Sequence, residues 1–414
     1  MHEVISSLLS HDRVKAARQH IERTDEATLA RQAALSAIPA PTGAEAERAA
    51  RVAELFREAG LREVRIDEAG NVSGWFSGNG GTLKDAAAPA PVVLSAHLDT
   101  VFGPDVDVSV ERRGRRLEGP GISDNARGIA ALVAVAEAVV TARVRTARPI
   151  LFAATVGEEG SGDLRGVKYL LNGGRGKGEG GGDHAAPAAF IALDGAGMER
   201  IVHRALGSRR YHVTFRGPGG HSWAAFGVAN PANAVGRATA LLADVPTPHA
   251  PRTTCAVVRL GGGTGLNSIP QEAWLDLDLR SEDPKALAQL DVTVRAALAR
   301  ATDDENRRRA SATPPLGIEI QLLGDRPSGV TPRTHPLVQA AIAANRILGK
   351  DAELASASTD ANVPIALGVP AIALGAGGKA GDAHLTSEWY ENTEGALGIV
   401  RALLVTAAVA EVEM

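Results

Sequence analysis

Five segments of the chain carry histidine or carboxylate side chains just beyond short apolar runs that are typical of buried strands. These residues are His97 and Asp99 in His-Leu-Asp-Thr, Asp124 in Gly-Ile-Ser-Asp-Asn, the adjacent pair Glu158 and Glu159, Asp194 in Leu-Asp-Gly, and His384 near the C-terminus. Imidazole nitrogen suits zinc, carboxylate oxygen suits most divalent cations, and one carboxylate can bridge two ions. This combination predicts a site for two divalent metal ions, as in a binuclear metallohydrolase.

Two of the aspartates have positions that admit more than one interpretation. Asp99 follows His97 by two residues, so both side chains point to the same side of an extended segment. Its carboxylate can therefore accept the second ring N–H of His97 and fix the tautomer. Asp124 precedes an apolar helix and is either a plain helix N-cap or a metal ligand. The other ligand-type residues favour the metal ligand.

The pair Glu158 and Glu159 predicts a division of roles. Adjacent acids repel each other unless a cation or a proton intervenes. Taken alone, two acids in a loop are more often a solvated charged patch. Beside a metal site, one carboxylate can bind metal while the other takes the proton of a water that attacks a carbonyl group.

Apolar runs separated by helical segments predict the fold class that positions these residues. The segment before residue 75 is helical and polar, with a strong helix over 44–59. Strand-like runs lie at 91–96, 149–155, 189–193 and 371–374, and an apolar helix is expected over 126–141. Continuous apolar strands alternating with helices indicate a mostly parallel sheet with helices on both faces. The predicted class is therefore α/β.

A second pattern interrupts this domain. Its expected elements, in order, are a strand at 211–215, a helix at 230–243, strands at 253–260 and 271–280, a helix at 283–301 and a strand at 318–323. The order βαββαβ is that of the ferredoxin-like split βαβ unit. We therefore expect an inserted α+β domain over 208–323, serving as a lid or dimerisation domain. The catalytic domain is expected to be discontinuous, over 1–207 and 324–414.

Three glycine-rich stretches receive separate interpretations. The segment 172–188 lacks the Gly-Lys-Ser/Thr ending of a phosphate-binding loop, so it is interpreted as a flexible insertion with His184 exposed on it. The segment 77–91 is expected to be a mobile surface hairpin. The segment 375–379 either brings backbone N–H groups to a substrate or is a simple turn.

Composition excludes several classes of partner. The formal net charge is -4, with 44 basic and 48 acidic residues, which provides no cationic field for nucleic acid or for a membrane surface. The single cysteine, Cys255, forms no internal disulfide, and the sequence contains no secretory signal and no apolar run long enough to span a bilayer. We expect a cytoplasmic protein that acts on small molecules.

Together, these motifs resemble the M20 metallopeptidase family, nearest its peptidase T-like tripeptidase branch. The resemblance rests on the metal-site motifs above, with Ala-His384-Leu-Thr-Ser-Glu388 closing the series. It also rests on Gly-Pro-Gly-Gly-His221-Ser, Asn267-Ser-Ile-Pro, Asp278-Leu-Arg280 and Ser358-Thr-Asp360-Ala-Asn362.

The resemblance implies roles for these residues. One zinc ion would be held by His97, Asp124 and Asp194, and the second by Asp124, Glu159 and His384, with Co²⁺ or Mn²⁺ as possible substitutes. Glu158 would be the general base and then the general acid, and Asp99 would orient His97. His221 would stabilise the oxyanion or bind the substrate carbonyl, often in the active site of a partner subunit. Asn267 and Arg280 would bind the end of the substrate. A homodimer formed through an edge strand or the outer helix of the inserted domain would follow.

The sequence departs from the family pattern at one point, and it is compatible with three functions. Where family members commonly have Asp-Asp-Lys, this chain has Asp124-Asn125-Ala126, which leaves metal preference open. The leading expectation is a zinc exopeptidase that removes the N-terminal residue of a short peptide. The alternatives are an amidohydrolase of N-acyl or N-carbamoyl amino acids, and a metal-binding scaffold without turnover.

Overall fold

The chain forms two compact units. The structure, a computed structural model, describes residues 1–78, 89–172 and 186–413. Unit 1 comprises Met1–Ala205 with Val330–Met414, and unit 2 comprises Leu206–Gly329, whereas the sequence predicted an insertion over 208–323. The predictions for 77–91 and 172–188, including exposed His184, fall mostly outside the described residues.

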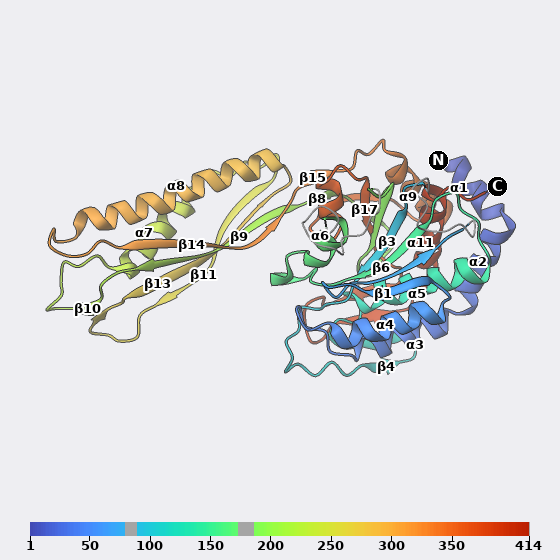
Figure 1. The fold of residues 1–414 in the computed structure, drawn as a ribbon, viewed down its shortest axis with the longest axis horizontal. Coiled ribbons are helices and arrows are strands. Elements are labelled where there is room, and N and C mark those ends of the chain that lie inside the picture. The colour runs from blue at the N-terminus through green and yellow to red at the C-terminus, as the bar shows by residue number, and fades with distance from the viewer. Residues whose placement is uncertain (79–88, 173–185, 414) are drawn as a thin grey trace. The chain divides into compact units, whose positions relative to one another are not determined.

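The main sheet of unit 1 has a parallel centre. Its strands follow the order β1-β2-β6-β3-β7-β17-β8-β15, and β16 pairs with β8 (Figure 1). Their bounds are β1 Arg62–Ile66, β2 Val72–Phe76, β3 Val92–His97, β6 Ile150–Thr155, β7 Ala189–Leu193, β8 Arg200–Ala205, β15 Gly329–Val330, β16 Glu353–Ala357 and β17 Ala371–Leu374. Strands β6, β3, β7 and β17 run parallel. Antiparallel pairs flank them: β2 pairs with β6 and β1 with β2 on one side, and β8 pairs with β17 on the other. The expected mostly parallel α/β sheet is confirmed.

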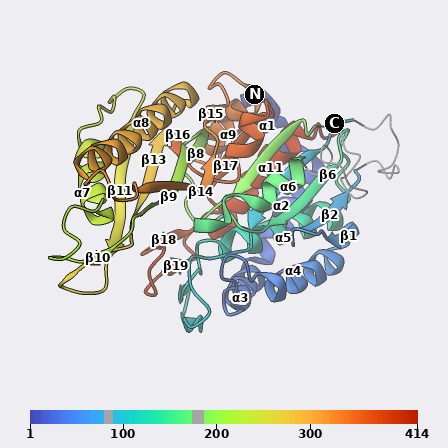
Figure 2. The ribbon, with the colours of Figure 1, turned by 60° about the vertical axis from the view of Figure 1, so that its left-hand side comes forward.

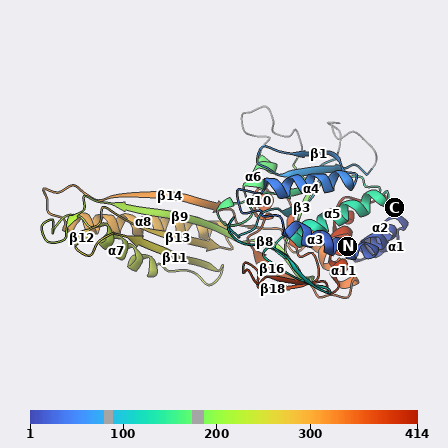
Figure 3. The same cartoon turned by 90° about the horizontal axis from the view of Figure 1, so that it is seen from below.

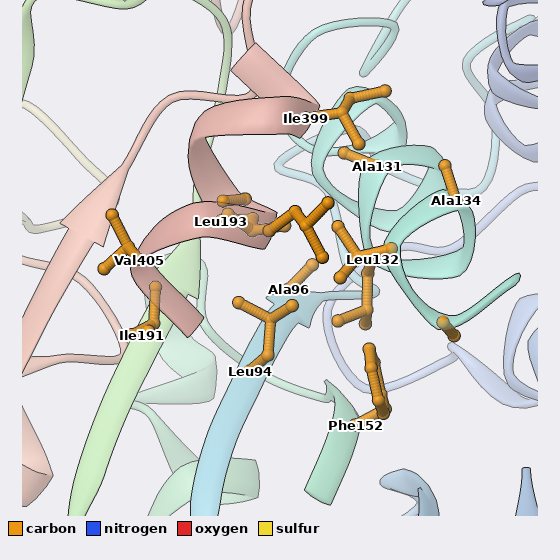
Figure 4. Close-up of a cluster of buried hydrophobic side chains, with 14 of the residues drawn as sticks. Leu94, Ala96, Ala131, Leu132, Ala134, Phe152, Ile191, Leu193, Ile399 and Val405 are labelled. Atoms are coloured by element: carbon orange, nitrogen blue, oxygen red, sulfur yellow. The ribbon is translucent and has the colours of Figure 1, made fainter. Parts of the chain in front are cut away.

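Helices cover both faces of this sheet. They are α1 His2–Ser10, α2 Asp12–Arg23, α3 Asp25–Ser36, α4 Ala46–Glu58, α5 Ala126–Thr141, α6 Arg165–Asn172, α9 Pro336–Ile347, α10 Asn362–Ala366 and α11 Gly395–Val409. Alternate strand residues belong to different cores: Leu94 packs with α5 and α11, whereas Val93 packs on the side of α6 and α10. Figure 4 shows the first core, with Leu94, Phe152 and Ile191 facing Leu132 of α5 and Val405 of α11. The first helix, α1, packs against α9 and α11 (Figure 2).

A smaller antiparallel sheet of unit 1 carries the C-terminal histidine loop. It has the order β18-β19-β5-β4, with bounds β18 Lys379–Gly381, β19 Trp389–Glu391, β5 Arg116–Glu118 and β4 Glu111–Arg113. His384 lies in the connection between β18 and β19, and Asp124 lies between β5 and α5. The sheet thus brings two distant parts of the sequence to one place.

Unit 2 has the predicted βαββαβ order. Its elements are β9 Gly207–Arg216, α7 Pro231–Ala243, β11 Thr253–Gly262, β13 Glu272–Ser281, α8 Pro284–Arg308 and β14 Gly317–Arg326, and the short strands β10 Gly220–His221 and β12 Ser268–Ile269 pair with each other. The sheet order is β11-β13-β9-β14 (Figure 3), with α7 and α8 packed on one face. Helix α8 continues to Arg308, beyond the predicted end at 301. In the described residues of both units, no helix has the length and apolar composition that a membrane span requires.

The packing of α5 on the sheet gives a stability prediction. Leu132 is completely buried in the core between the sheet and α11. Leu132→Ala should lower the free energy of unfolding of unit 1 by ~2–5 kcal/mol, because it removes buried methyl groups and leaves a cavity. Urea unfolding would measure this change. Leu367→Ala, at a side chain that is 48% exposed, is the matched control, and equal losses in both variants would contradict the packing described.

Candidate metal centre

Three neighbouring strands bring their carboxyl ends to one edge of the main sheet. His97 is the last residue of β3, Glu158 and Glu159 follow β6, and Asp194 follows β7. The ladder pairs His97 with Thr155, so β3 and β6 end at the same level. Residues beyond the carboxyl ends of parallel strands converge in the crevice where such sheets bind ligands.

The structure brings all five predicted metal ligands together. We call His97, Asp124, Glu159, Asp194 and His384 the ligand cluster. His97 Nε2 lies 3.0 Å from Asp124 Oδ1 and 3.8 Å from Asp194 Oδ1. Ligand atoms of His97, Asp124 and Glu159 all lie within 4.8 Å of one another.

His384 completes the cluster from the loop after β18. Its Nε2 lies 3.2 Å from Asp124 Oδ2 and 3.2 Å from Glu159 Oε1. Asp124 therefore faces a different imidazole with each of its two carboxylate oxygens. This is the arrangement that a bridging ligand requires.

Asp99 orients His97 through a different atom from the one predicted. The ring Nδ1 donates to the backbone carbonyl of Asp99 at 3.0 Å, whereas the carboxylate Oδ1 is 3.7 Å away. The carboxylate instead accepts the backbone N–H groups of Glu158 and Glu159, both at 2.9 Å, and the hydroxyl of Thr42 at 2.8 Å. At 3.7 Å the carboxylate lies beyond hydrogen-bond distance of the ring, so the carbonyl of the same residue is the closer partner of the ring N–H. Asp99 thus fixes both the imidazole and the glutamate pair.

Two further polar side chains were not assigned roles from the sequence. The buried carboxylate of Glu388 accepts the backbone N–H groups of Gly121, Ser123 and Asp124, at 3.1, 2.7 and 2.9 Å. The presence of Glu388 in the His384 motif was the available signal, although spacing alone did not identify its partners.

Asn125 explains part of the departure from Asp-Asp-Lys. Its amide nitrogen donates to Leu193 O at 2.8 Å, and its oxygen accepts from Gly195 N at 3.2 Å and from Gly128 N at the start of α5. One amide thus holds the peptide groups on both sides of Asp194. An aspartate there would lack the donor to Leu193.

The titration behaviour of the cluster reflects crowded carboxylates. Burial lowers the pKa of His97, but hydrogen bonds to Asp124 and Asp194 outweigh burial and raise this pKa well above 6.5. The hydrogen bond to Asp124 is the largest of the effects that raise the pKa of His384 to about 9. Burial, with Asp124 nearby, raises the pKa of Glu159 to about 7.

The donor set fits divalent cations. Three carboxylates and two imidazoles face one another with little exposure, apart from His384, whose side chain is 55% exposed. Burial, followed by the charge of Asp124, raises the pKa of Glu159, and a bound cation would offset both effects. The cluster could therefore hold metal ions, with Asp124 shared between two sets of ligands.

The three predicted substrate-binding residues belong to unit 2. His221 on β10 and Asn267 just before β12 lie on paired segments, joined by the bond from Ser222 N to Asn267 O at 2.9 Å. Arg280 lies on β13 and pairs with Asp278 at 2.9 Å. The structure thus brings His221 and Asn267 together, and it gives Arg280 a carboxylate partner.

Comparison with known proteins identifies the family. The model of peptidase family M20/M25/M40 matches residues 93–409. The chain belongs to this family. Family M20 proteins of this kind are hydrolases acting on peptide or related amide bonds, and this chain is such an enzyme. None of the curated sequences compared with this M20 protein matches it significantly.

Solved structures with the same fold cover nearly the whole M20 chain. Aminopeptidase PepT from Bacillus cereus is 20% identical, with a TM-score of 0.71 over 93% of this chain and 99% of that one. A tripeptidase from Staphylococcus aureus is 20% identical, with a TM-score of 0.72 over 92% and 98%. An amidase of the hydantoinase/carbamoylase family from Burkholderia vietnamiensis is 20% identical, with a TM-score of 0.65 over 94% and 96%. At these identities the likeness establishes the fold alone.

The raised pKa of His384 predicts proton release on metal binding. Metal ions bind neutral imidazole, so at about pH 7 binding must expel the imidazolium proton. Apparent zinc affinity should therefore increase as pH rises towards the His384 pKa of about 9. Calorimetry of zinc binding in buffers of different ionisation enthalpy should show that His384→Ala releases fewer protons per bound ion than the wild type does. His249→Ala, on an exposed histidine of unit 2, is the control, and an unchanged proton count in His384→Ala would contradict the assignment.

Proposed function

We propose that this M20 enzyme is a binuclear zinc exopeptidase that removes the N-terminal residue of short peptides. The observation that carries the proposal is the convergence of the ligand cluster beside Glu158. His97, Asp124 and Asp194 would hold one ion, and Asp124, Glu159 and His384 the other. Co²⁺ or Mn²⁺ would suit the same ligands.

Glu158 is the residue that we assign to proton transfer. Zinc ions in the cluster would polarise the scissile carbonyl and lower the pKa of the attacking water. Glu158 takes a proton from the water as its oxygen bonds to the carbonyl carbon, and then gives that proton to the amine nitrogen as the C–N bond breaks. The backbone of Glu158 is held by Asp99 at 2.9 Å, and the residue is only 5% exposed. Both features support a fixed proton carrier shielded from bulk water.

Residues of unit 2 supply substrate contacts in this proposal. His221 would donate to the substrate carbonyl or to the oxyanion, and Asn267 beside it would bind the peptide end. Arg280 offers a planar fork for a terminal carboxylate, which would share the guanidinium with Asp278. The pairing of β10 with β12 supports a joint role for His221 and Asn267.

The rival function is hydrolysis of N-acyl or N-carbamoyl amino acids. The likeness to a hydantoinase/carbamoylase family amidase favours it, with coverage as complete as that of the peptidases. Both functions use the same proton transfer and differ in the substrate group beside the scissile bond. A panel of dipeptides, tripeptides and N-substituted amino acids, followed by mass spectrometry, separates them: release of N-terminal residues supports the exopeptidase, and turnover confined to N-substituted amino acids supports the rival.

Replacing the proton carrier tests the mechanism common to both functions. Glu158→Gln should lower kcat by about 10²–10⁴-fold, because the amide cannot accept the proton. Zinc content, measured by elemental analysis, should stay the same, since Glu158 is not assigned as a ligand. Glu68→Gln, at a surface carboxylate, is the control. Unchanged turnover in Glu158→Gln would overturn the assignment, and absence of turnover on every substrate by the wild type would favour a scaffold.

We also propose a homodimer formed through unit 2. Strand β11 is an edge of its sheet, and it exposes Val258 at 55% and Leu260 at 57%. Exposed apolar side chains along an edge strand favour pairing with a second copy.

Light scattering after size exclusion tests the dimer. Leu260→Glu should give a monomer, because it places a charge in the proposed contact. Val292→Glu, on the outer helix α8 at a side chain 61% exposed, should stay dimeric. A wild-type monomer at all concentrations would contradict the proposal, and a monomer only for Val292→Glu would move the contact to the helix.

A further inference from the structure

A buried carboxyl group outside the ligand cluster lies behind the ends of β3 and β6. Asp360 is in the turn between β16 and α10 and is only 3% exposed. Its Oδ2 lies 2.5 Å from the hydroxyl oxygen of Thr155, the last residue of β6. Its other oxygen, Oδ1, is buried and has no hydrogen-bond partner among the described residues. The mechanism above gives this group no role.

Counting hydrogens at Thr155 indicates the charge state of Asp360. The Thr155 hydroxyl oxygen lies close to two acceptors, Asp360 Oδ2 and the carbonyl of Ala96 at 3.3 Å, but the hydroxyl has only one hydrogen. If Asp360 were ionised, one of these contacts would join two oxygens without a hydrogen between them. A protonated Asp360 donates to Thr155, and Thr155 then donates to Ala96, so both contacts become hydrogen bonds.

The surroundings of Asp360 agree with a neutral acid. No salt bridge from a described Lys or Arg reaches it, and an unpaired buried carboxylate oxygen costs far more than the unpaired carbonyl oxygen of a neutral acid. The charged groups facing it are His97, Asp99 and Asp194. Burial raises the pKa of Asp360 to about 6; the Thr155 contact and His97 oppose this rise, and Asp99 and Asp194 add to it.

Thr155 connects this acid to the ligand cluster. It pairs with His97 across β3 and β6, and its carbonyl accepts the N–H of Leu98 at 2.6 Å. Glu158 and Glu159 follow it by three and four residues. A hydrogen-bond chain from Asp360 through Thr155 to Ala96 therefore locks together the strand ends that carry the first histidine ligand and the glutamate pair.

We propose that Asp360 is a neutral carboxylic acid that acts as a positioning residue, donating to Thr155 so that Thr155 binds Ala96 and fixes the ends of β3 and β6. The inference rests on the proposed metal centre for its consequence, but not for the protonation state itself. Neutrality also matters electrostatically, because a further anion would join a site already crowded with carboxylates.

Asp360→Asn is the decisive variant, because an amide can donate to Thr155 as the acid does but carries no charge at any pH. We expect the Co²⁺ affinity of Asp360→Asn, followed by the visible absorption of the bound ion, to match that of the wild type. Thr155→Val, which removes the hydroxyl at nearly constant volume, should weaken Co²⁺ binding by about 10- to 100-fold, the usual effect of losing a group that supports metal ligands. Thr155→Ser should restore most of that loss.

Two measurements keep the outcomes separate. Infrared spectra of the metal-free wild type minus metal-free Asp360→Asn should show the C=O stretch of one protonated carboxyl group at about pH 5, below the Asp360 pKa of about 6. Absence of that band, or weak Co²⁺ binding by a folded Asp360→Asn, would mean that an ionised Asp360 is used, and would overturn the proposal. Wild-type affinity in Thr155→Val would overturn the hydrogen-bond chain. Failure of the wild type to bind Co²⁺ would instead count against the proposed metal centre.

Discussion

The carboxylate of Asp99 is the interaction on which the site depends. This carboxylate accepts the backbone N–H groups of Glu158 and Glu159, and the backbone carbonyl of Asp99 accepts the ring N–H of His97. Asp99 therefore ties the end of β3 to the loop after β6. Burial opposes ionisation of this carboxyl group, but nearby His97 and the backbone N–H groups of Glu159 and Glu158 outweigh burial and lower its pKa to about 2, so it stays ionised at neutral pH. A buried anion satisfied by fixed donors is rigid, because moving it would leave charge and N–H groups unpaired.

Other buried side chains around the ligand cluster also hold backbone groups by hydrogen bonds. Glu388 holds the turn that precedes α5, Asn125 holds both peptide groups beside Asp194, and the buried guanidinium of Arg48 donates to the carbonyl of Leu98. In each case a buried side chain from a distant segment fixes the backbone next to a ligand. The ligand side chains thus meet because their main chains have little freedom. Preorganisation of this kind lets like charges be held close together before a cation arrives.

The sequence predicted which residues form the ligand cluster, but it predicted less about the side chains that hold their backbones in place. The ligand residues follow apolar strands, so their position at one sheet edge could be inferred, as could the βαββαβ order of unit 2. The atom through which Asp99 holds His97 could not be inferred, since carboxylate and carbonyl lie on the same residue. Glu388 binds Asp124 across 264 residues, and Asp360 meets Thr155 across 205, and spacing in the sequence carries no record of such contacts. The sequence predicted too short a length for helix α8, because its last turns are polar and lack the regular spacing of apolar residues that indicates a helix.

The points where the chain enters and leaves unit 2 have an evolutionary consequence. Strands β9 and β14 are antiparallel neighbours whose register pairs Ser208 with Arg326, so the first and last strands of the unit begin and end side by side. A module with adjacent ends can be gained, lost or exchanged without rerouting its host. Variation of substrate among proteins sharing this architecture can therefore proceed by replacement of this unit, while the ligand cluster and Glu158, which lie outside it, are inherited unchanged.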